Sequence, residues 1–360
     1  MPLDHYLTLG RSGLRVSPFA LGAMTFGEDP GGAGSSVEES EKVLGTYLDR
    51  GGNFIDTANF YTNGHSEKIL GDWFAAHPGQ REHVVLASKF FGNLFPGDPN
   101  GGGAGRSSII AQLHETLRRL QTDYLDVYWL HIWDRHTPIE ETMRTLDDLV
   151  HAGKVRYIGF SNTPAWVTAQ AQTTALLRDW TPLIALQVEY SLLARTVEGE
   201  LAPLAQQQGM ALVPWGPLKG GFLSGKYRRG AEVTDSARAA YVGGPSDHDF
   251  DVIDAVAAIA DELETTSAAV ALAWLLARPQ TVVPIVGARR LEHLEANLAG
   301  LDVYLTTEQL RVLDEVSAPT LNYPAEMNGQ RRATLQFGGT TVDGEPSTVY
   351  PALLASDIRY

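Results

Sequence analysis

Short apolar runs alternate with helical patterns along most of the chain, and this alternation limits the possible folds more than any other feature. Most of the runs lack polar alternation, which is typical of parallel strands buried on both faces. Eight strands separated by helices predict an α/β fold, a (β/α)8 TIM barrel. A doubly wound sheet with an added domain is the alternative, but no Pro, Gly or Ser linker divides the repeat into two blocks. The eight runs are Pro18–Gly22, Asn53–Ala58, Val84–Phe90, Leu125–His131, Val155–Ser161, Ala185–Glu189, Ala211–Trp215 and Val282–Val286.

The segments between these runs carry helix start and stop signals. Thr137 and Glu140 flank Pro138 in a pattern that predicts a capping box, with proline at the first helical position. Gly153 predicts the end of the same helix.

Three further segments depart from the alternation. The hairpin predicted at Leu7–Val16, with a Ser-Gly turn, precedes the first strand. Residues 91–106 form a glycine-rich loop and residues 226–250 a long polar connection. We expect residues 1–317 to form one barrel domain that includes the hairpin. Residues 318–360 are expected to form an irregular C-terminal tail that packs on or near the barrel.

Composition excludes several classes of function. The 360 residues carry a formal net charge of −15 and include no Cys. An acidic chain is a poor match for nucleic acid, because polyanion binding requires a basic surface. The absence of Cys excludes disulfides, zinc ribbons and thiol nucleophiles. Since neither a secretory signal nor a bilayer-spanning apolar stretch is recognisable, we expect a cytoplasmic protein that binds no membrane.

Polar and charged residues gather where the predicted strands end, which is where TIM barrels place their active sites. Asp56, Lys89 and His131 end the second, third and fourth strands, and Tyr61 follows in the next loop. An ammonium group beside a phenol lowers the pKa of the phenol, and Asp56 would hold Lys89 by charge pairing. His131 would hydrogen-bond a substrate carbonyl oxygen, which Tyr61 would protonate as hydride reaches the carbon.

Three stretches of sequence resemble the aldo-keto reductase family. They are GGNFIDTANFYTNGHSEKILG at 51–71, YLDVYWLHIWDRHTPIEETMRTLDDLVHAGKVRYIGFSN at 124–162, and PIVGARRLEHLEANL at 284–298. The resemblance extends over residues 7–317. It is nearest to the branch that includes potassium-channel β subunits, aflatoxin aldehyde reductases and bacterial aryl-alcohol or sugar-aldehyde reductases.

The resemblance implies a reversible reductase of aldehydes or ketones, with Asp56, Tyr61, Lys89 and His131 as its catalytic tetrad. It also implies that NADP(H) lies extended across the barrel mouth. It places Gly22, Ala23, Met24 and Asp56 near the nicotinamide ribose, Ser161, Asn162 and Gln187 at the carboxamide, Trp215 on the nicotinamide ring, Gly216, Pro217, Leu218, Lys219, Gly220 and Lys226 along the pyrophosphate, and Gly287, Arg289, His293 and Asn297 at the adenosine end.

The adenosine segment departs from the commonest family pattern. His293 stands where Gln is usual, and Ala296 where Glu or Gln is usual. Arg289 still offers a planar guanidinium to a 2′-phosphate, and Arg290 is a possible second contact. This pattern favours NADP(H) over NAD(H).

The substrate side is less defined by the sequence. Phe60 and Trp133 stand beside tetrad residues and would wall an apolar substrate pocket, whereas Trp166, at a helix start, is interpreted as packing. No histidine motif predicts a metal. Aromatic aldehydes, sugar aldehydes and cyclic ketones all stay open as substrates, and so do a monomer and a homo-oligomer. The alternative function is an NADP(H)-binding regulatory subunit with little turnover.

Overall fold

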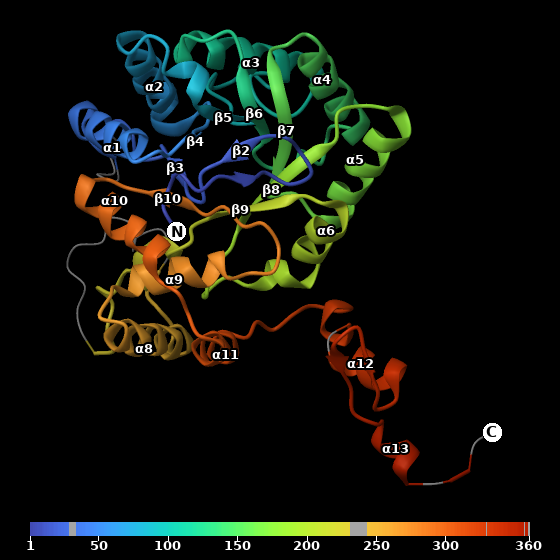
Figure 1. Cartoon of the computed structure of the whole chain (residues 1–360). Helices are drawn as coiled ribbons and strands as arrows, with labels where there is room; N and C mark the ends of the chain where they lie inside the picture. Colours follow the sequence, from blue (N-terminus) through green and yellow to red (C-terminus); the bar gives the residue numbers. More distant parts are fainter. Residues whose placement is uncertain (29–33, 231–242, 329, 356, 359–360) are drawn as a thin grey trace.

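The computed structural model confirms the (β/α)8 barrel (Figure 1). It describes residues 1–28, 34–230, 243–328, 330–355 and 357–358. Part of the expected polar connection at 226–250 therefore lies outside the described residues. Eight parallel strands form one sheet in the order β10-β3-β4-β5-β6-β7-β8-β9. Their bounds are β3 Ala20–Gly22, β4 Phe54–Asp56, β5 Val85–Phe90, β6 Leu125–Leu130, β7 Val155–Ser161, β8 Leu183–Glu189, β9 Ala211–Trp215 and β10 Ile285–Gly287.

The sheet closes into a barrel because β10 pairs with β3 and the segment before β10 is bridged to β9. Ile285 of β10 pairs with Ala20 of β3, and a parallel bridge joins Leu212 of β9 to Val282. The last strand was predicted to begin at Val282 but begins three residues later. Pro284 lies between the bridge and the strand, and proline has no N–H to donate to a ladder.

Helices surround the barrel and follow the strands in turn (Figure 1). Their bounds are α1 Val37–Asp49, α2 His65–Ala76, α3 Arg106–Leu120, α4 Ile139–His151, α5 Ala165–Arg178, α6 Leu201–Gln208, α8 Asp247–Glu262, α9 Ser267–Leu276, α10 Leu291–Leu298 and α11 Thr307–Val316. The capping box predicted at Thr137 is wrong. Pro138 rather than Thr137 is the N-cap of α4, and proline has no side-chain acceptor for a helix N–H. The Thr137 hydroxyl lies outside the helix and donates to Asp134 (2.7 Å).

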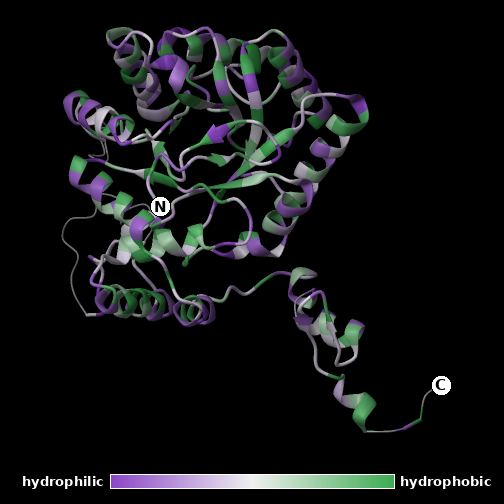
Figure 2. Ribbon diagram, in the orientation of Figure 1, coloured by the Kyte–Doolittle hydropathy of each residue, from purple (hydrophilic) through white to green (hydrophobic). Residues whose placement is uncertain are grey.

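Two apolar cores hold these layers together. One lies between strands and helices, and the other fills the barrel interior. Figure 2 shows largely hydrophobic strands inside helices that mix hydrophobic and hydrophilic residues. Within the barrel, Trp129 pairs in register with Gly159. A Cβ atom at Gly159 would lie 2.2 Å from the Trp129 ring, so the missing side chain provides the space that the indole fills.

The N-terminal hairpin closes one end of the barrel. Its strands are β1 Leu7–Thr8 and β2 Arg15–Val16. Leu9 and Val16 are fully buried in the interior core. Gly10 approaches the backbone of β8 and β9 so closely that a Cβ atom there would lie 2.0 Å from the Ile184 carbonyl oxygen. The hairpin thus seals the end opposite to the strand carboxyl termini.

The C-terminal segment extends away from the barrel (Figure 1). Leu321 and Ala325 still lie beside Gly199, at the end of the short helix η3 Thr196–Gly199. Beyond them come α12 Gln330–Phe337, β11 Thr341–Val342, β12 Glu345–Pro346 and α13 Pro351–Leu354. None of the helices among the described residues is long and apolar enough to cross a membrane.

Candidate active site

Lys89 is the centre of the polar cluster at the carboxyl ends of the strands. Its side chain is fully buried. The ammonium group donates to Asp56 Oδ2 (2.5 Å), to the Thr57 carbonyl oxygen (2.8 Å) and to Tyr61 Oη (3.1 Å). An ammonium group has three protons, so each one has an acceptor here. Three of the four predicted tetrad residues therefore meet in one hydrogen-bonded unit.

The strand register explains why these groups meet. Asp56 pairs with Ala87 of β5, and Lys89 follows two residues later on the same face. His131 follows the end of β6, one strand further around the barrel, and its backbone N–H donates to the Phe90 carbonyl oxygen. Tyr61 opens the short helix η1 Tyr61–Gly64, which the Thr62 hydroxyl ties to the Phe26 carbonyl oxygen.

Burial of this cluster favours a protonated Tyr61 phenol. Burial raises the pKa of Tyr61 above its ordinary value, and the Lys89 charge offsets only part of this effect. The net shift of the Tyr61 pKa is therefore upward, and the lowering expected from the sequence is wrong. Burial lowers the pKa of Lys89, but Asp56 and Tyr61 raise it further, so the ammonium group stays charged.

His131 is a neutral imidazole. Burial and, second, the Lys89 charge lower its pKa to about 3. Its Nδ1 atom is buried without a hydrogen-bond partner among the described residues, which leaves Nε2 as the ring nitrogen available to a ligand. The ring lies edge-on to Tyr61, with centroids 5.8 Å apart, and stacks on Phe60 at 5.1 Å.

The residues expected at the carboxamide are linked to one another and to the tetrad. Gln187 donates from Nε2 to Asp56 Oδ1 (2.9 Å), so both Asp56 oxygens accept a hydrogen bond. Asn162 donates to Ser161 Oγ and to the His131 carbonyl oxygen, both at 2.9 Å. Asn162 also accepts from the Trp215 indole N–H (3.0 Å). These side chains join the ends of β6, β7, β8 and β9.

The segment expected along the pyrophosphate follows β9. Gly216, Gly220 and Gly221 have positive φ angles, a conformation that glycine adopts without the steric cost of a Cβ atom. Pro217 is buried and Leu218 packs against the core. Lys219 forms an ion pair with Glu189 (2.6 Å), which sequence reasoning did not predict. The Lys226 ammonium lies 5.7 Å from the Tyr227 ring centroid.

Cationic side chains gather at the expected adenosine end. Burial lowers the pKa of His293, and the charges of Arg290, Arg289 and Lys226 act in the same direction. Arg290 pairs with Glu292 (2.9 Å), whereas Arg289 forms no ion pair with any residue that the structure describes. Asn297 donates to the Gly287 carbonyl oxygen (3.1 Å) and so fixes α10 against β10.

Glu39 of α1 also reaches this end of the site. Its carboxylate accepts a hydrogen bond from the Leu291 N–H, the first residue of α10 (2.8 Å). Sequence reasoning missed this contact because 252 residues separate the two partners. One N–H of this helix start is therefore already used by the protein.

Aromatic and aliphatic side chains surround the mouth on the substrate side. Phe60 is 38% exposed above His131, and Trp133 meets Trp166 edge-on with centroids 5.5 Å apart. Trp166 is 63% exposed, so its interpretation as a packing residue is wrong. At the end of β3, Gly22 and Ala23 are buried and Met24 is exposed.

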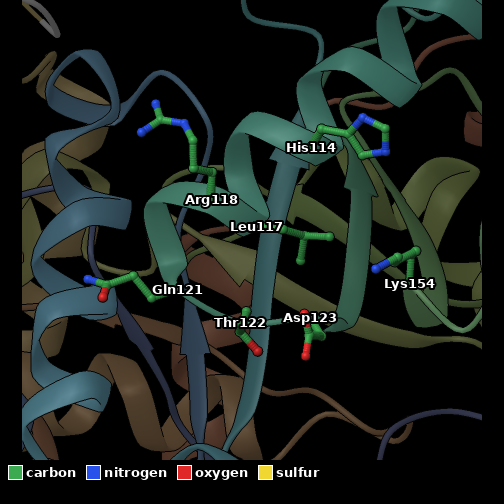
Figure 3. Close-up of a pocket in the computed structure, with 7 residues that line it drawn as sticks. All are labelled: His114, Leu117, Arg118, Gln121, Thr122, Asp123 and Lys154. Atoms are coloured by element: carbon green, nitrogen blue, oxygen red, sulfur yellow. The ribbon is translucent and has the colours of Figure 1, made fainter.

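A separate surface hollow lies at the opposite end of the strands (Figure 3). It sits where α3 leads into β6 and where Lys154 leads into β7. Its lining is mostly polar and contains none of the tetrad residues. The hollow is lined by His114, Leu117, Arg118, Gln121, Thr122, Asp123 and Lys154.

The barrel with this Asp-Tyr-Lys-His cluster at its mouth defines an oxidoreductase of carbonyl groups. A sequence profile of the aldo/keto reductase family matches residues 18–318. The chain belongs to this family, which uses nicotinamide cofactors.

Three relatives are similar over most of their length. The chain is 35% identical over 330 residues to a putative aryl-alcohol dehydrogenase of Saccharomyces cerevisiae, covering 88% of each chain. It is 36% identical to an aryl-alcohol dehydrogenase [NADP(+)] of Phanerodontia chrysosporium, covering 87% of this chain and 85% of the relative. It is 33% identical to a norsolorinic acid reductase of Aspergillus flavus, covering 89% and 82%.

Proposed function

We propose that this protein reduces an aromatic aldehyde or ketone to the alcohol with NADPH, reversibly, and that Tyr61 is the proton donor. The observation that carries the proposal is the bond from Lys89 to Tyr61 Oη (3.1 Å). Because Lys89 is the donor in this bond, the phenol hydrogen is free to point toward a substrate. We infer that the substrate is a small carbonyl compound held at the barrel mouth.

Each tetrad residue has its own role in the proposed reaction. Nε2–H of the neutral His131 donates to the carbonyl oxygen and orients it, while Tyr61 gives its proton to the same oxygen. Lys89 stabilises the phenolate that remains, and Asp56 holds Lys89 in place. Bound NADPH supplies the hydride that the carbonyl carbon accepts.

The residues present fit an NADP(H) molecule. The segment after β9 is rich in glycine, which suits a close approach of backbone N–H groups to a pyrophosphate. The exposed indole of Trp215 offers a face for a nicotinamide ring. Arg289, with no described carboxylate beside it, is suited to a 2′-phosphate. The printed name of the Phanerodontia relative, which includes NADP(+), supports the same cofactor.

The mouth favours an aromatic substrate. Phe60, Trp133 and Trp166 present ring faces and edges that attract another ring. Two relatives are named for aryl alcohols and one for norsolorinic acid, which agrees with this surface.

The test is steady-state kinetics on a panel of aromatic, sugar and short aliphatic aldehydes and ketones, with NADPH and NADH compared by cofactor absorbance. We expect aromatic carbonyls with NADPH to give the highest kcat/KM. No turnover of any carbonyl would contradict the proposal and favour a cofactor-binding regulatory subunit.

The pH dependence should differ between the two directions. Reduction needs protonated Tyr61, whose pKa lies above its ordinary value of 10.0, so its rate should stay flat from about pH 6 to 9. Alcohol oxidation needs the phenolate and should rise across the same range. Because the pKa of His131 is about 3, neither profile should show a histidine inflection. Single-turnover rates measured in both directions check this; an inflection near pH 6.5 would contradict it.

A further inference from the structure

Gln112 is a buried amide on α3, behind the substrate side of the site. Its Oε1 atom accepts from the Phe91 N–H (2.8 Å) and from Asn59 Nδ2 (2.9 Å). Its Nε2 atom donates to the Gly103 carbonyl oxygen (3.2 Å) and to Ser108 Oγ (2.7 Å). One side chain therefore joins the loop after β4, the first residue after β5 and the end of the glycine-rich loop.

The partners of Gln112 adjoin the residues proposed to meet the substrate. Asn59 directly precedes Phe60 and Tyr61, and it also donates to the Gly92 carbonyl oxygen (2.7 Å). A Cβ atom at Gly92 would lie 2.2 Å from the Phe60 ring, so this ring rests directly on the Gly92 backbone. Phe60 in turn stacks on His131. The position of Phe60 thus depends on how Asn59 and Gly92 are held.

The backbone at Phe91 shows that this anchor holds an unfavourable conformation. Phe91 has a φ angle of 115°, which a bulky residue rarely adopts. Such angles persist where the surroundings impose them. Here the Phe91 N–H donates to Gln112 and its carbonyl oxygen accepts from the Gly103 N–H (2.8 Å). Without Gln112, nothing described would hold the Phe91 N–H in this direction.

We propose that Gln112 is a positioning residue for substrate selection. By tying the Phe60 loop to both ends of the glycine-rich loop, it fixes the aromatic wall at the distance from His131 that a ring-bearing carbonyl compound requires. It acts through Phe60 and touches neither substrate nor cofactor. This inference rests on the proposed carbonyl reduction.

A matched pair of variants tests the proposal. Gln112→Leu removes every bond of the anchor. Gln172→Leu removes an equally buried amide on α5 that accepts from the Leu183 N–H (2.8 Å), at the sealed end of the barrel. Gln112→Glu keeps the acceptor for Phe91 and Asn59 but loses the donor to Gly103. The three variants thus separate loss of a buried amide from loss of this anchor.

In Gln112→Leu we expect kcat/KM for an aromatic aldehyde to fall about 10- to 100-fold through a raised KM, the scale of a misplacement near 1 Å. The kcat/KM for a short aliphatic aldehyde should fall much less, and the Kd for NADPH should stay within about twofold of the wild-type value. Gln112→Glu should recover part of the aromatic preference. Gln172→Leu should lower thermal stability without changing the aromatic-to-aliphatic ratio.

Hydrogen exchange gives a readout that does not depend on turnover. The amides of residues 59–63 and 91–103 should exchange faster in Gln112→Leu and at the wild-type rate in Gln172→Leu. Unchanged exchange in these segments, or an equal loss for aromatic and aliphatic substrates, would overturn the role of Gln112. A wild-type protein inactive on every carbonyl would instead overturn the proposed function, and the exchange rates would still decide whether Gln112 anchors the loops.

Discussion

Tyr61→Phe should lower the turnover of every carbonyl substrate by about 10²- to 10⁴-fold, the usual contribution of a general acid. The substitution removes only the hydroxyl that accepts from Lys89 at 3.1 Å. The ring remains to pack against Phe60, at a centroid distance of 5.4 Å, so the mouth should keep its shape. The loss should therefore appear in kcat, measured at saturating substrate, with KM changed little.

Tyr323→Phe is the matched control, because this tyrosine is 77% exposed in the C-terminal segment. It should reduce carbonyls at the wild-type rate. The Kd for NADPH, measured by calorimetry, should be the same in wild type and in both variants. A Tyr61→Phe protein with wild-type kcat would show that another group delivers the proton.

Arg289→Ala should raise the Kd for NADPH by about 10- to 100-fold while changing the Kd for NADH by less than about twofold. A hydrogen bond to a charged group contributes about 1.5–3 kcal/mol, which corresponds to this change in Kd. The guanidinium makes no ion pair with a described residue that would compete for a phosphate. With a net charge of −15 on the whole chain, binding of an anionic cofactor depends on a few local cations.

Arg290→Ala is the control for this second prediction. Its side chain already pairs with Glu292 at 2.9 Å and is well exposed, so its removal should affect both cofactors slightly. Calorimetric titration of each protein with each cofactor checks the pair. An equal loss of affinity for NADPH and for NADH in Arg289→Ala would contradict a contact with the 2′-phosphate.

The barrel was predictable because buried parallel strands leave a strong signal in the sequence. β7 and β9 have the predicted bounds. The other strands differ from the prediction at their ends, where single hydrogen bonds determine which residue is the last of a strand. The meeting of Asp56, Lys89 and Tyr61 was also predictable. Residues that end neighbouring parallel strands emerge at the same rim, and the register then brings them into contact.

The links between side chains were not predictable from local patterns. Lys219 with Glu189 and Glu39 with Leu291 each join separate parts of the chain, and only the closed barrel brings them together. The helix signal at Thr137 failed for a local reason. The helix begins one residue later than the pattern predicts, with Pro138 at the N-cap, and the Thr137 hydroxyl donates to the Asp134 carboxylate.

The seal formed by the hairpin at the base of the barrel has a kinetic consequence. Leu9 and Val16 fill that end and belong to the core that fills the barrel interior, so the tetrad is reached from the carboxyl ends of the strands. Both reactants of the proposed reduction then approach over the same rim. The reactant that binds nearer to the barrel interior has to bind first and leave last.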